Sequence, residues 1–89
     1  MESQWVLYIL ECGDGTLYTG ITDNLSRRLK MHNTGKGAKY TRGRTPVVLR
    51  YSENCENHSC ALRREFSVKR LTRAQKMELI CGNQVNVPE

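Results

Sequence analysis

Three observations predict an α+β domain with a small three-stranded antiparallel sheet and helices on both of its faces. Two apolar segments flank a glycine-rich turn near the N-terminus, a third apolar segment follows mid-chain, and three segments have helical spacing with capping residues. The expected order is strand, strand, helix, strand, helix, helix. We expect one domain over residues 1–82 and a loose tail over residues 83–89, because 89 residues leave room for a single modest core.

The first two strands are predicted to form a hairpin. Residues 5–12 are almost continuously apolar, as in a strand covered on both faces, and residues 17–22 supply the returning strand. Gly13-Asp14-Gly15 can form the tight turn between them. A three-residue turn pairs Tyr8 with Gly20 and Leu10 with Tyr18, whereas a two-residue turn would put the two tyrosines on opposite faces.

The first helix and the third strand come next in the chain. Asp23 or Asn24 can cap a helix that ends near residues 33–35. Residues 35–44 hold three glycines and four cations without an apolar period, so we expect a mobile surface loop. Residues 46–51 restore a strand, with Pro46 at its first position, where a missing N–H is tolerated.

Two further helices are predicted in the C-terminal third. Asn57 or Ser59 can start the first, and its apolar residues are expected to form the inner side: Ala61, Leu62, Phe66 and Val68. Thr72 and Gln75 fit a capping box for a last short helix, which Gly82 would stop.

Charge and composition point to a polyanionic partner. Lys and Arg outnumber Asp and Glu by 14 to 9, and a net charge of +5 favours nucleic acid; the alternative is a basic surface that only keeps the domain soluble. The sequence has neither an apolar run long enough for a membrane span nor a leader segment, so we expect a cytosolic protein without membrane association. An oligomer or a recruiting protein could add selectivity.

The four cysteines are expected to be reduced thiols in that compartment. Cys55, His58 and Cys60 form only part of a metal cluster, because a structural zinc site needs four ligands. Cys12 and Cys81 are interpreted as small buried apolar residues.

Tyr8 and Tyr18 are the first candidates for chemistry. The predicted hairpin register puts both phenols on one face of the sheet, roughly 7 Å apart. Gly20, opposite Tyr8, would leave open space that a phosphate could enter. The alternative is that both tyrosines only pack in the core.

Arg28 and His32 lie one turn apart on the edge of the first helix that can face the hairpin. Arg28 offers a planar fork for phosphate oxygens, and His32 could donate to a phosphate or help accept the proton of an attacking water. Their alternatives are a solvated helix cation and a half-buried helix residue. Arg27 and Lys30 are interpreted as plain surface charges.

Glu65 falls in the middle of the apolar face of its helix. A carboxylate there needs a partner, because an unpaired buried charge costs several kcal/mol. A divalent cation held by one carboxylate, waters and a substrate phosphate would meet that need. Lys69, four residues further on, is the competing partner.

These residues, with the motifs Val6-Leu7-Tyr8 and Tyr18-Thr19-Gly20, resemble the GIY-YIG endonuclease superfamily over about residues 5–69, and its short stand-alone bacterial members most closely. The chain departs from the family pattern in lacking the first glycine, in carrying Thr19 in the second motif, and in having Ile21 where repair-excision relatives tend to carry lysine. We expect Thr19 to face away from the phenols.

The resemblance implies phosphodiester hydrolysis at a site formed by Tyr8, Tyr18, Arg28, His32 and Glu65, with one Mg²⁺ or Mn²⁺ on Glu65. Tyr8 would take the proton from water, Arg28 would stabilise the pentacovalent charge, and Tyr18 would position the phosphate. Because an ordinary phenol has a pKa near 10, nearby cations and the metal would have to favour the phenolate.

The leading interpretation is therefore a metal-dependent endonuclease that acts on DNA and is structure-selective or only weakly selective. The alternatives are a nucleic-acid-binding module that does not cut and an RNA-directed nuclease; the sequence does not separate DNA from RNA. We expect the loop cations to contact phosphates: Lys36, Lys39, Arg42 and Arg44.

Overall fold

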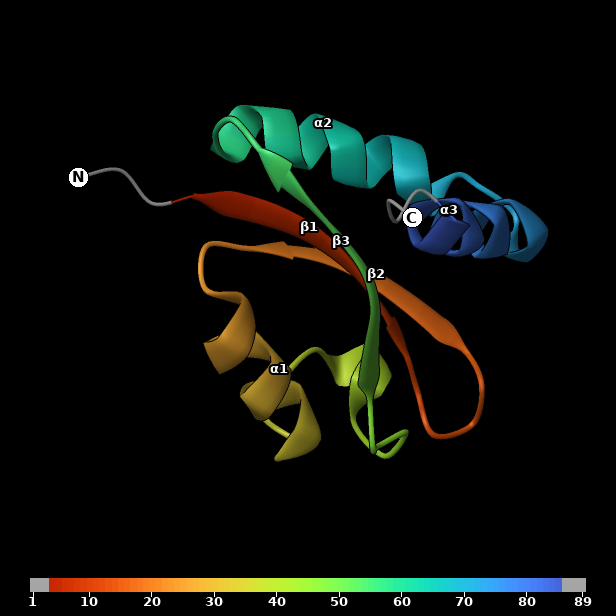
Figure 1. Ribbon diagram of the computed structural model, residues 1–89. Helices are drawn as coiled ribbons and strands as arrows, with labels where there is room; N and C mark the ends of the chain where they lie inside the picture. Colours follow the sequence, from red (N-terminus) through yellow and green to blue (C-terminus); the bar gives the residue numbers. More distant parts are fainter. Residues whose placement is uncertain (1–3, 86–89) are drawn as a thin grey trace.

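The computed structural model describes residues 4–85, with side chains through residue 82, and confirms the predicted α+β fold and its element order (Figure 1). The strands are β1 (Trp5–Glu11), β2 (Leu17–Thr22) and β3 (Val48–Cys55). The helices are α1 (Leu25–Asn33), α2 (His58–Lys69) and α3 (Arg73–Val85), and a 3₁₀ turn spans Lys39–Thr41. No helix of this described region is long and apolar enough to cross a membrane.

The sheet is antiparallel with β1 in the centre, in the order β2-β1-β3. As predicted, helices cover both faces: α1 lies on one, and α2 and α3 lie on the other (Figure 1). A β-bulge in β3 lies opposite Ile9 and Leu10, so Leu49 and Tyr51 pack in different cores although they are two residues apart.

The alternating side chains of β1 divide the core into two clusters. Leu7 and Ile9 pack with Ala61, Val68 and Ile80 under α2 and α3. On the opposite face, a second cluster is formed by Tyr8, Leu10, Cys12 and Val47, with Tyr18, Leu25, Leu29 and Leu49 against it. Both Leu7 and Tyr8 are almost completely buried, at 0% and 1% exposed.

The predicted hairpin register is confirmed. Tyr8 pairs with Gly20 and Leu10 pairs with Tyr18, so the two tyrosines share the face that α1 covers. Thr19 pairs with Ile9 and faces the opposite side, as expected. Gly15 adopts the left-handed conformation in the turn, with φ of 87°.

The predicted caps are also present. The Asn24 side chain accepts from the N–H of Arg27 at 3.1 Å, and Asn57 caps α2 in the same way. The capping box is reciprocal, since Thr72 and Gln75 each accept a backbone N–H of the other.

Three predictions about the helices and strands were wrong. β3 begins at Val48, so Pro46 lies before the strand, and α3 continues past Gly82 to Val85, because a glycine weakens a helix without having to end it. Of the tail predicted to be loose, residues 83–85 are helical and residues 86–89 lie outside the described region. Cys81 is exposed, whereas Cys12 is buried as expected.

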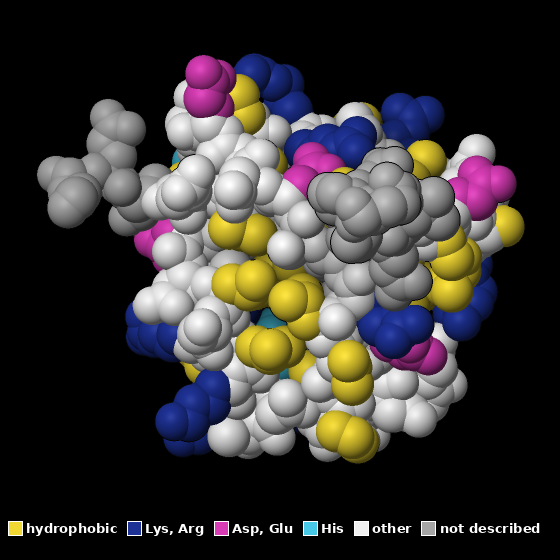
Figure 2. Space-filling model, in the orientation of Figure 1, with side chains coloured by type: hydrophobic (Ala, Val, Ile, Leu, Met, Phe, Trp, Pro, Cys, Tyr) yellow, Lys and Arg dark blue, Asp and Glu magenta, His cyan; other side chains and the backbone are white. Residues whose placement is uncertain are grey.

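The inner face of α2 also differs from the prediction. Ala61 and Val68 are buried, but Leu62 and Phe66 are 45% and 65% exposed. The helix presents the stripe at 61, 65 and 68 to the sheet, because this narrow stripe fits its close approach to β1 and β2. In the orientation of Figure 1, apolar side chains gather in the middle of the surface, and Lys and Arg side chains lie on several sides of them (Figure 2).

The segment 35–44, predicted as a mobile loop, is held at several points. The backbone N–H of Gly13 donates to the carbonyl of Arg44, and Thr41 is completely buried. Asn33 bonds both backbone polar groups of Val47, at 2.7 Å to its N–H and 3.3 Å to its carbonyl. These bonds fix the segment between α1 and the hairpin.

Candidate active site

A hydrogen-bonded chain of three side chains lies between β1, α1 and the 3₁₀ turn. The Tyr8 hydroxyl is 3.1 Å from Nε2 of His32, and Nδ1 of His32 is 2.8 Å from Oγ1 of Thr41. Thr41 in turn donates to the carbonyl of Ala38 at 2.9 Å. His32 and Thr41 are both completely buried, so water cannot replace these bonds.

The direction of each bond follows from the single proton of the Thr41 hydroxyl. Because that proton goes to the Ala38 carbonyl, Oγ1 must accept from Nδ1–H of His32. Burial, and then the charge of Arg28, lower the pKa of His32, which keeps the ring neutral. Nε2 is then an acceptor, and the Tyr8 hydroxyl donates its proton to it.

Three aromatic rings meet around this chain. The ring centroids of Tyr8 and Tyr18 are 6.3 Å apart, close to the predicted separation of the phenols, and His32 lies edge-on to both rings at 6.0 and 5.3 Å. Tyr40 stacks on Tyr18 at 5.7 Å. The sequence prediction that α1 faces the hairpin is therefore correct, but His32 is buried behind the phenols and reaches no solvent.

Arg28 is half-buried beside both phenols. The Tyr8 phenol, first of all, raises the pKa of Arg28, so the guanidinium stays charged. In the other direction, burial raises the pKa of Tyr8 more than the Arg28 side chain lowers it. The expectation that neighbouring charges favour the phenolate was thus wrong for these residues alone: desolvation outweighs the cation.

Two glycines allow this close packing. A Cβ on Gly20 would lie 2.6 Å from the Tyr8 hydroxyl oxygen, so the open space predicted above Gly20 is filled by the Tyr8 ring. A Cβ on Gly37 would lie 2.3 Å from Nδ1 and 2.8 Å from Cα of His32. Gly20 and Gly37 are therefore needed for the positions of the phenol and the imidazole.

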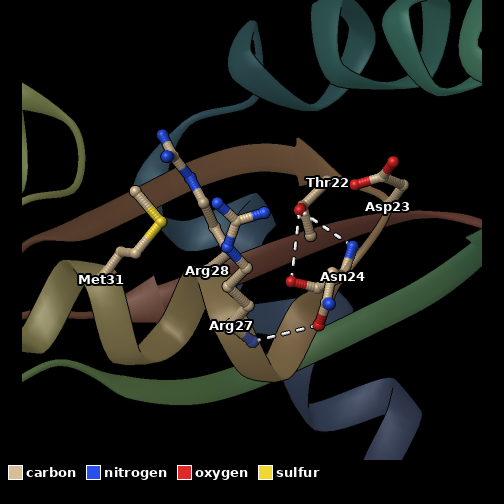
Figure 3. Close-up of a pocket in the computed structure, with 6 residues that line it drawn as sticks. All are labelled: Thr22, Asp23, Asn24, Arg27, Arg28 and Met31. Atoms are coloured by element: carbon tan, nitrogen blue, oxygen red, sulfur yellow. Dashed lines mark hydrogen bonds between the residues drawn. The ribbon is translucent and has the colours of Figure 1, made fainter.

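A hollow of about 200 Å³ opens beside Arg28 at the start of α1. Figure 3 shows its lining residues: Thr22, Asp23, Asn24, Arg27, Arg28 and Met31. Hydrogen bonds hold the turn between β2 and α1 in place. The Thr22 side chain bonds the backbone of Asn24, and the Asn24 side chain accepts the backbone N–H of Arg27. Two guanidinium groups at a hollow of this size suit an anion such as a phosphate group.

Glu65 lies on the inner face of α2, on the stripe that meets the sheet. Its side chain is 20% exposed, and Oε2 is 3.2 Å from Nζ of Lys69. Its negative charge contributes, as a minor cause, to the raised pKa of Tyr8, so it is electrostatically coupled to the phenol. Among the residues with described positions, no three His, Cys, Asp or Glu side chains gather as a metal cluster. Glu65 is therefore a single carboxylate ligand at most.

Comparison with known proteins identifies the family. The sequence model described as the GIY-YIG catalytic domain matches residues 4–78. The chain belongs to the GIY-YIG family. A UPF0213 protein of Halobacterium salinarum is 56% identical over 73 residues, which are 82% of this chain and 95% of the relative. One from Haloquadratum walsbyi is 47% identical over 89 residues, covering 99% and 100% of the two chains.

Solved structures agree with this assignment. The solution NMR structure of a UPF0213 protein from Bacillus halodurans has a TM-score of 0.57 and 46% identity, covering 88% of this chain and 83% of that one. The NMR structure of a protein from E. faecalis has a TM-score of 0.66 and 37% identity, covering 99% and 94%. The GIY-YIG fold is thus shown for this chain.

Two departures from the family motifs can be placed in the structure. Val6, which stands at the glycine position of the first motif, is partly buried and pairs with Thr22 of β2 and Asn54 of β3. Thr19, in the second motif, is 2% exposed and faces the α2 and α3 core, away from the phenols. Its buried hydroxyl has no hydrogen-bond partner among the described residues, so nothing in the structure explains why threonine stands there.

The predicted phosphate-binding cations divide into two groups. Lys36, Lys39 and Arg42 are exposed. Arg44 is instead engaged: it pairs with Asp14 at 2.7 Å, and its guanidinium lies 4.5 Å from the centre of the Tyr40 ring. Arg44 therefore ties the segment to the hairpin turn. Arg27 and Lys30 are exposed, as predicted.

Sequence reasoning missed the second layer of the site. Thr41 orients His32, Gly37 gives it room, and Tyr40 stacks on Tyr18. All three lie in a segment without apolar periodicity, so only the Gly-x-x-Tyr-Thr composition of residues 37–41 could have marked it. Cys55, His58 and Cys60 do not gather as a metal cluster in the described structure, and the His58 ring instead packs on Trp5 with centroids 4.3 Å apart.

Proposed function

We propose that this GIY-YIG protein is a metal-dependent endonuclease that hydrolyses phosphodiester bonds in nucleic acid, with DNA as the first candidate substrate. The observation that carries the proposal is the directed chain from Tyr8 through His32 to Thr41. A structural tyrosine needs one hydrogen-bond partner, but it does not need a neutral imidazole whose acceptor nitrogen faces the phenol. This arrangement can move a proton.

The proton path follows from the bond directions. As the oxygen of an attacking water forms its bond to phosphorus, the water proton passes to the Tyr8 oxygen. The phenolic proton moves at the same time to Nε2 of His32, the bond from phosphorus to the leaving oxygen breaks, and the leaving oxygen takes a proton from a second water. Because burial lowers the pKa of His32, the imidazolium then returns its proton through Tyr8 to the hydroxide left by that second water. Tyr8 need not be a phenolate beforehand, which removes the difficulty of its raised pKa.

Arg28 and Tyr18 are proposed to bind the phosphate that is cut. Arg28 lies next to both phenols and also lines the hollow at the start of α1, so a phosphate in the hollow would meet a guanidinium that neighbours the Tyr8 phenol. The guanidinium would stabilise the charge that builds up on the phosphoryl oxygens. Tyr18, held between His32 and Tyr40, would donate to a phosphate oxygen and fix its position.

Glu65 is the proposed ligand of Mg²⁺ or Mn²⁺. A single half-buried carboxylate fits this role, because Mg²⁺ is commonly held by one or two carboxylates together with waters and substrate phosphates. The ion, when bound, would neutralise charge on the scissile phosphate and the leaving oxygen. Lys69 now engages Oε2 of Glu65, so it would have to turn away.

Nucleic-acid affinity is assigned to the exposed loop cations Lys36, Lys39 and Arg42. Each phosphate contact should contribute about 0.7 to 0.9 to the slope of log affinity against log salt. Arg44 is proposed to act indirectly, through Tyr40, and Gly20 by admitting the Tyr8 ring.

One variant tests the proposal directly. Glu65→Gln keeps the size of the side chain and removes its charge, so cleavage with Mg²⁺ or Mn²⁺ should fall by orders of magnitude while binding without metal stays level or rises. Lys69→Gln is the matched control: it breaks the same ion pair but should leave cleavage nearly intact. Cleavage is measured on single-stranded, duplex, flapped and branched DNA and on RNA, with the melting temperature of each variant.

The second candidate is a nucleic-acid-binding module that does not cut. It is favoured by the Glu65–Lys69 ion pair, which gives the carboxylate a partner without a metal. If the two variants lose the same stability and wild type cuts none of the substrates, the binding module is the correct function. Cleavage of RNA alone would assign an RNA-directed nuclease.

A further inference from the structure

A second hollow lies on the side of the domain where α3 begins. It measures about 220 Å³ and is lined by residues from the hairpin, the loop and the first turn of α3: Thr16, Leu17, Tyr40, Arg73 and Lys76. Of these residues only Tyr40 also contacts the proposed active site. It connects the two, because its ring stacks on Tyr18 with centroids 5.7 Å apart.

The cations of this hollow have no partner among the described residues. Arg73 and Lys76 take part in none of the ion pairs seen there. Asp14 of the hairpin turn is already paired with Arg44, and Glu78 of α3 is exposed and pairs with neither cation. Lys76 is half-buried, and burial, followed by the charge of Lys69, lowers its pKa. Two cations without a partner anion thus line one hollow, which suits an anionic ligand.

The volume of the hollow and the chemistry of its lining residues restrict the class of anion that could bind there. At about 220 Å³ the hollow is below the roughly 300 Å³ at which ordinary small-molecule pockets begin, so it fits one unit of a larger ligand. Its lining combines two cations, Arg73 and Lys76, with Leu17, Tyr40 and Thr16. Cations beside an aromatic side chain are the usual combination for a single nucleic-acid strand. A duplex keeps its base faces stacked inside the helix and offers none to Tyr40 or Leu17.

We propose that this hollow binds one unpaired nucleotide of the substrate, next to the phosphate that is cut, with its own phosphate on Arg73 and Lys76. The proposal rests on the proposed nuclease function and defines its substrate class: nucleic acid with a single-stranded segment beside the cleavage point. Tyr40 is then a shared wall, with one side on Tyr18 of the active site and an exposed part on the hollow.

The test compares two double variants that each remove two positive charges. Arg73→Gln/Lys76→Gln changes the hollow, and Lys30→Gln/Arg63→Gln changes exposed cations outside both hollows. Affinity for a fluorescent single-stranded oligonucleotide is measured by anisotropy without divalent metal, over a series of salt concentrations. The hollow variant should lower the log–log salt slope by about 0.7, the value for one phosphate contact in a single strand. The control should lower it by less than half as much.

Blunt duplex of the same length separates the substrate classes. On it, the two double variants should behave alike. An equal loss of single-strand affinity in both variants would show a general charge effect and overturn the proposal. A loss of blunt-duplex affinity in the hollow variant alone would show that the hollow does not bind an unpaired nucleotide. If wild type binds and cuts but the hollow variant is unchanged, this proposal fails alone; if wild type neither binds nor cuts, the proposed function fails with it.

If the hollow variant does not fold, a second measurement on the wild-type protein tests the proposal. Wild type is titrated with a single-stranded dinucleotide carrying a 5′-phosphate, and its amide NMR signals are followed. Signals of Arg73, Lys76 and Tyr40 should shift together with one dissociation constant. Shifts confined to the loop cations, or absent, would place the nucleotide elsewhere and reject the hollow.

Discussion

The two faces of the sheet use the same strand for different purposes. Leu7 and Ile9 of β1 pack into a core that is almost entirely aliphatic, under α2 and α3. Tyr8, between them in sequence, lies on the other face in a core that contains hydrogen-bonded polar groups, with His32 and Thr41 both completely buried. The face under α2 and α3 therefore contributes stability mainly through apolar burial, and the other maintains a proton-transfer geometry at a cost in buried polar groups.

This difference predicts whether a substitution changes mainly stability or mainly activity. On the aliphatic face, a change of volume should alter the free energy of unfolding. On the polar face, a change of one atom should alter activity more than stability, because the bonds fix orientation. The two faces are separated by only one residue along β1, so neighbouring variants test the comparison closely.

The largest expected effect is on activity, at Tyr8. Tyr8→Phe keeps the ring and removes the hydroxyl, so cleavage should fall by about 10²- to 10⁴-fold through loss of the proton acceptor. Nε2 of His32 loses its partner, at a cost in stability of about 1–3 kcal/mol. Single-turnover cleavage rates and denaturant unfolding measure the two. Cleavage within twofold of wild type would show that the polar face is structural.

The aliphatic face should respond in the opposite way. Ile9→Ala removes a completely buried side chain, so the free energy of unfolding should drop by about 2–5 kcal/mol. Because Ile9 points away from the phenols, cleavage per folded molecule should stay close to wild type. Denaturant melts and cleavage at a temperature well below the transition test this. A loss of activity larger than the unfolded fraction would mean that the faces are coupled.

Gly37 provides a smaller and more specific effect. Gly37→Ala places a methyl group against the ring and the backbone of His32, and backbone cannot move aside as a side-chain tip can. We expect a loss of about 1–3 kcal/mol in stability together with reduced cleavage, since the ring must shift from Tyr8 and Thr41. A displaced Tyr8–His32 bond would appear in the imidazole NMR signals.

The smallest effect concerns pH. The folded-state pKa of His32 is lowered, so the unfolded chain binds a proton first as pH falls. Stability from this group is therefore fully present above the unfolded pKa of about 6.5 and is lost as pH falls below it toward the folded pKa, by at most about 1.4 kcal/mol per pH unit. Urea midpoints between pH 8 and pH 5 measure this. His32→Asn should flatten the dependence; an unchanged slope would assign it to other groups.

Much of the fold could be read from local patterns. The caps Asn24, Asn57 and Thr72 are where the sequence places them, because each bond joins groups three residues apart. The hairpin register followed from the turn length, and it put Tyr8 and Tyr18 on one face. The inner face of α2 was harder: its hydrophobic pattern is weak, and Leu62 and Phe66 are exposed although they are apolar.

For the candidate site, the sequence by itself determined the residue types, their helix and strand positions, and the shared face of the two phenols, since these depend on periodicities within one element. Only the tertiary structure decided that the Tyr8 ring fills the space above Gly20, that Arg44 is held by Asp14, and that Thr41 turns His32 toward Tyr8. The reason is physical: these contacts join residues 8, 14, 32 and 41 to distant partners through desolvation and packing, which leave no periodic signal in the chain.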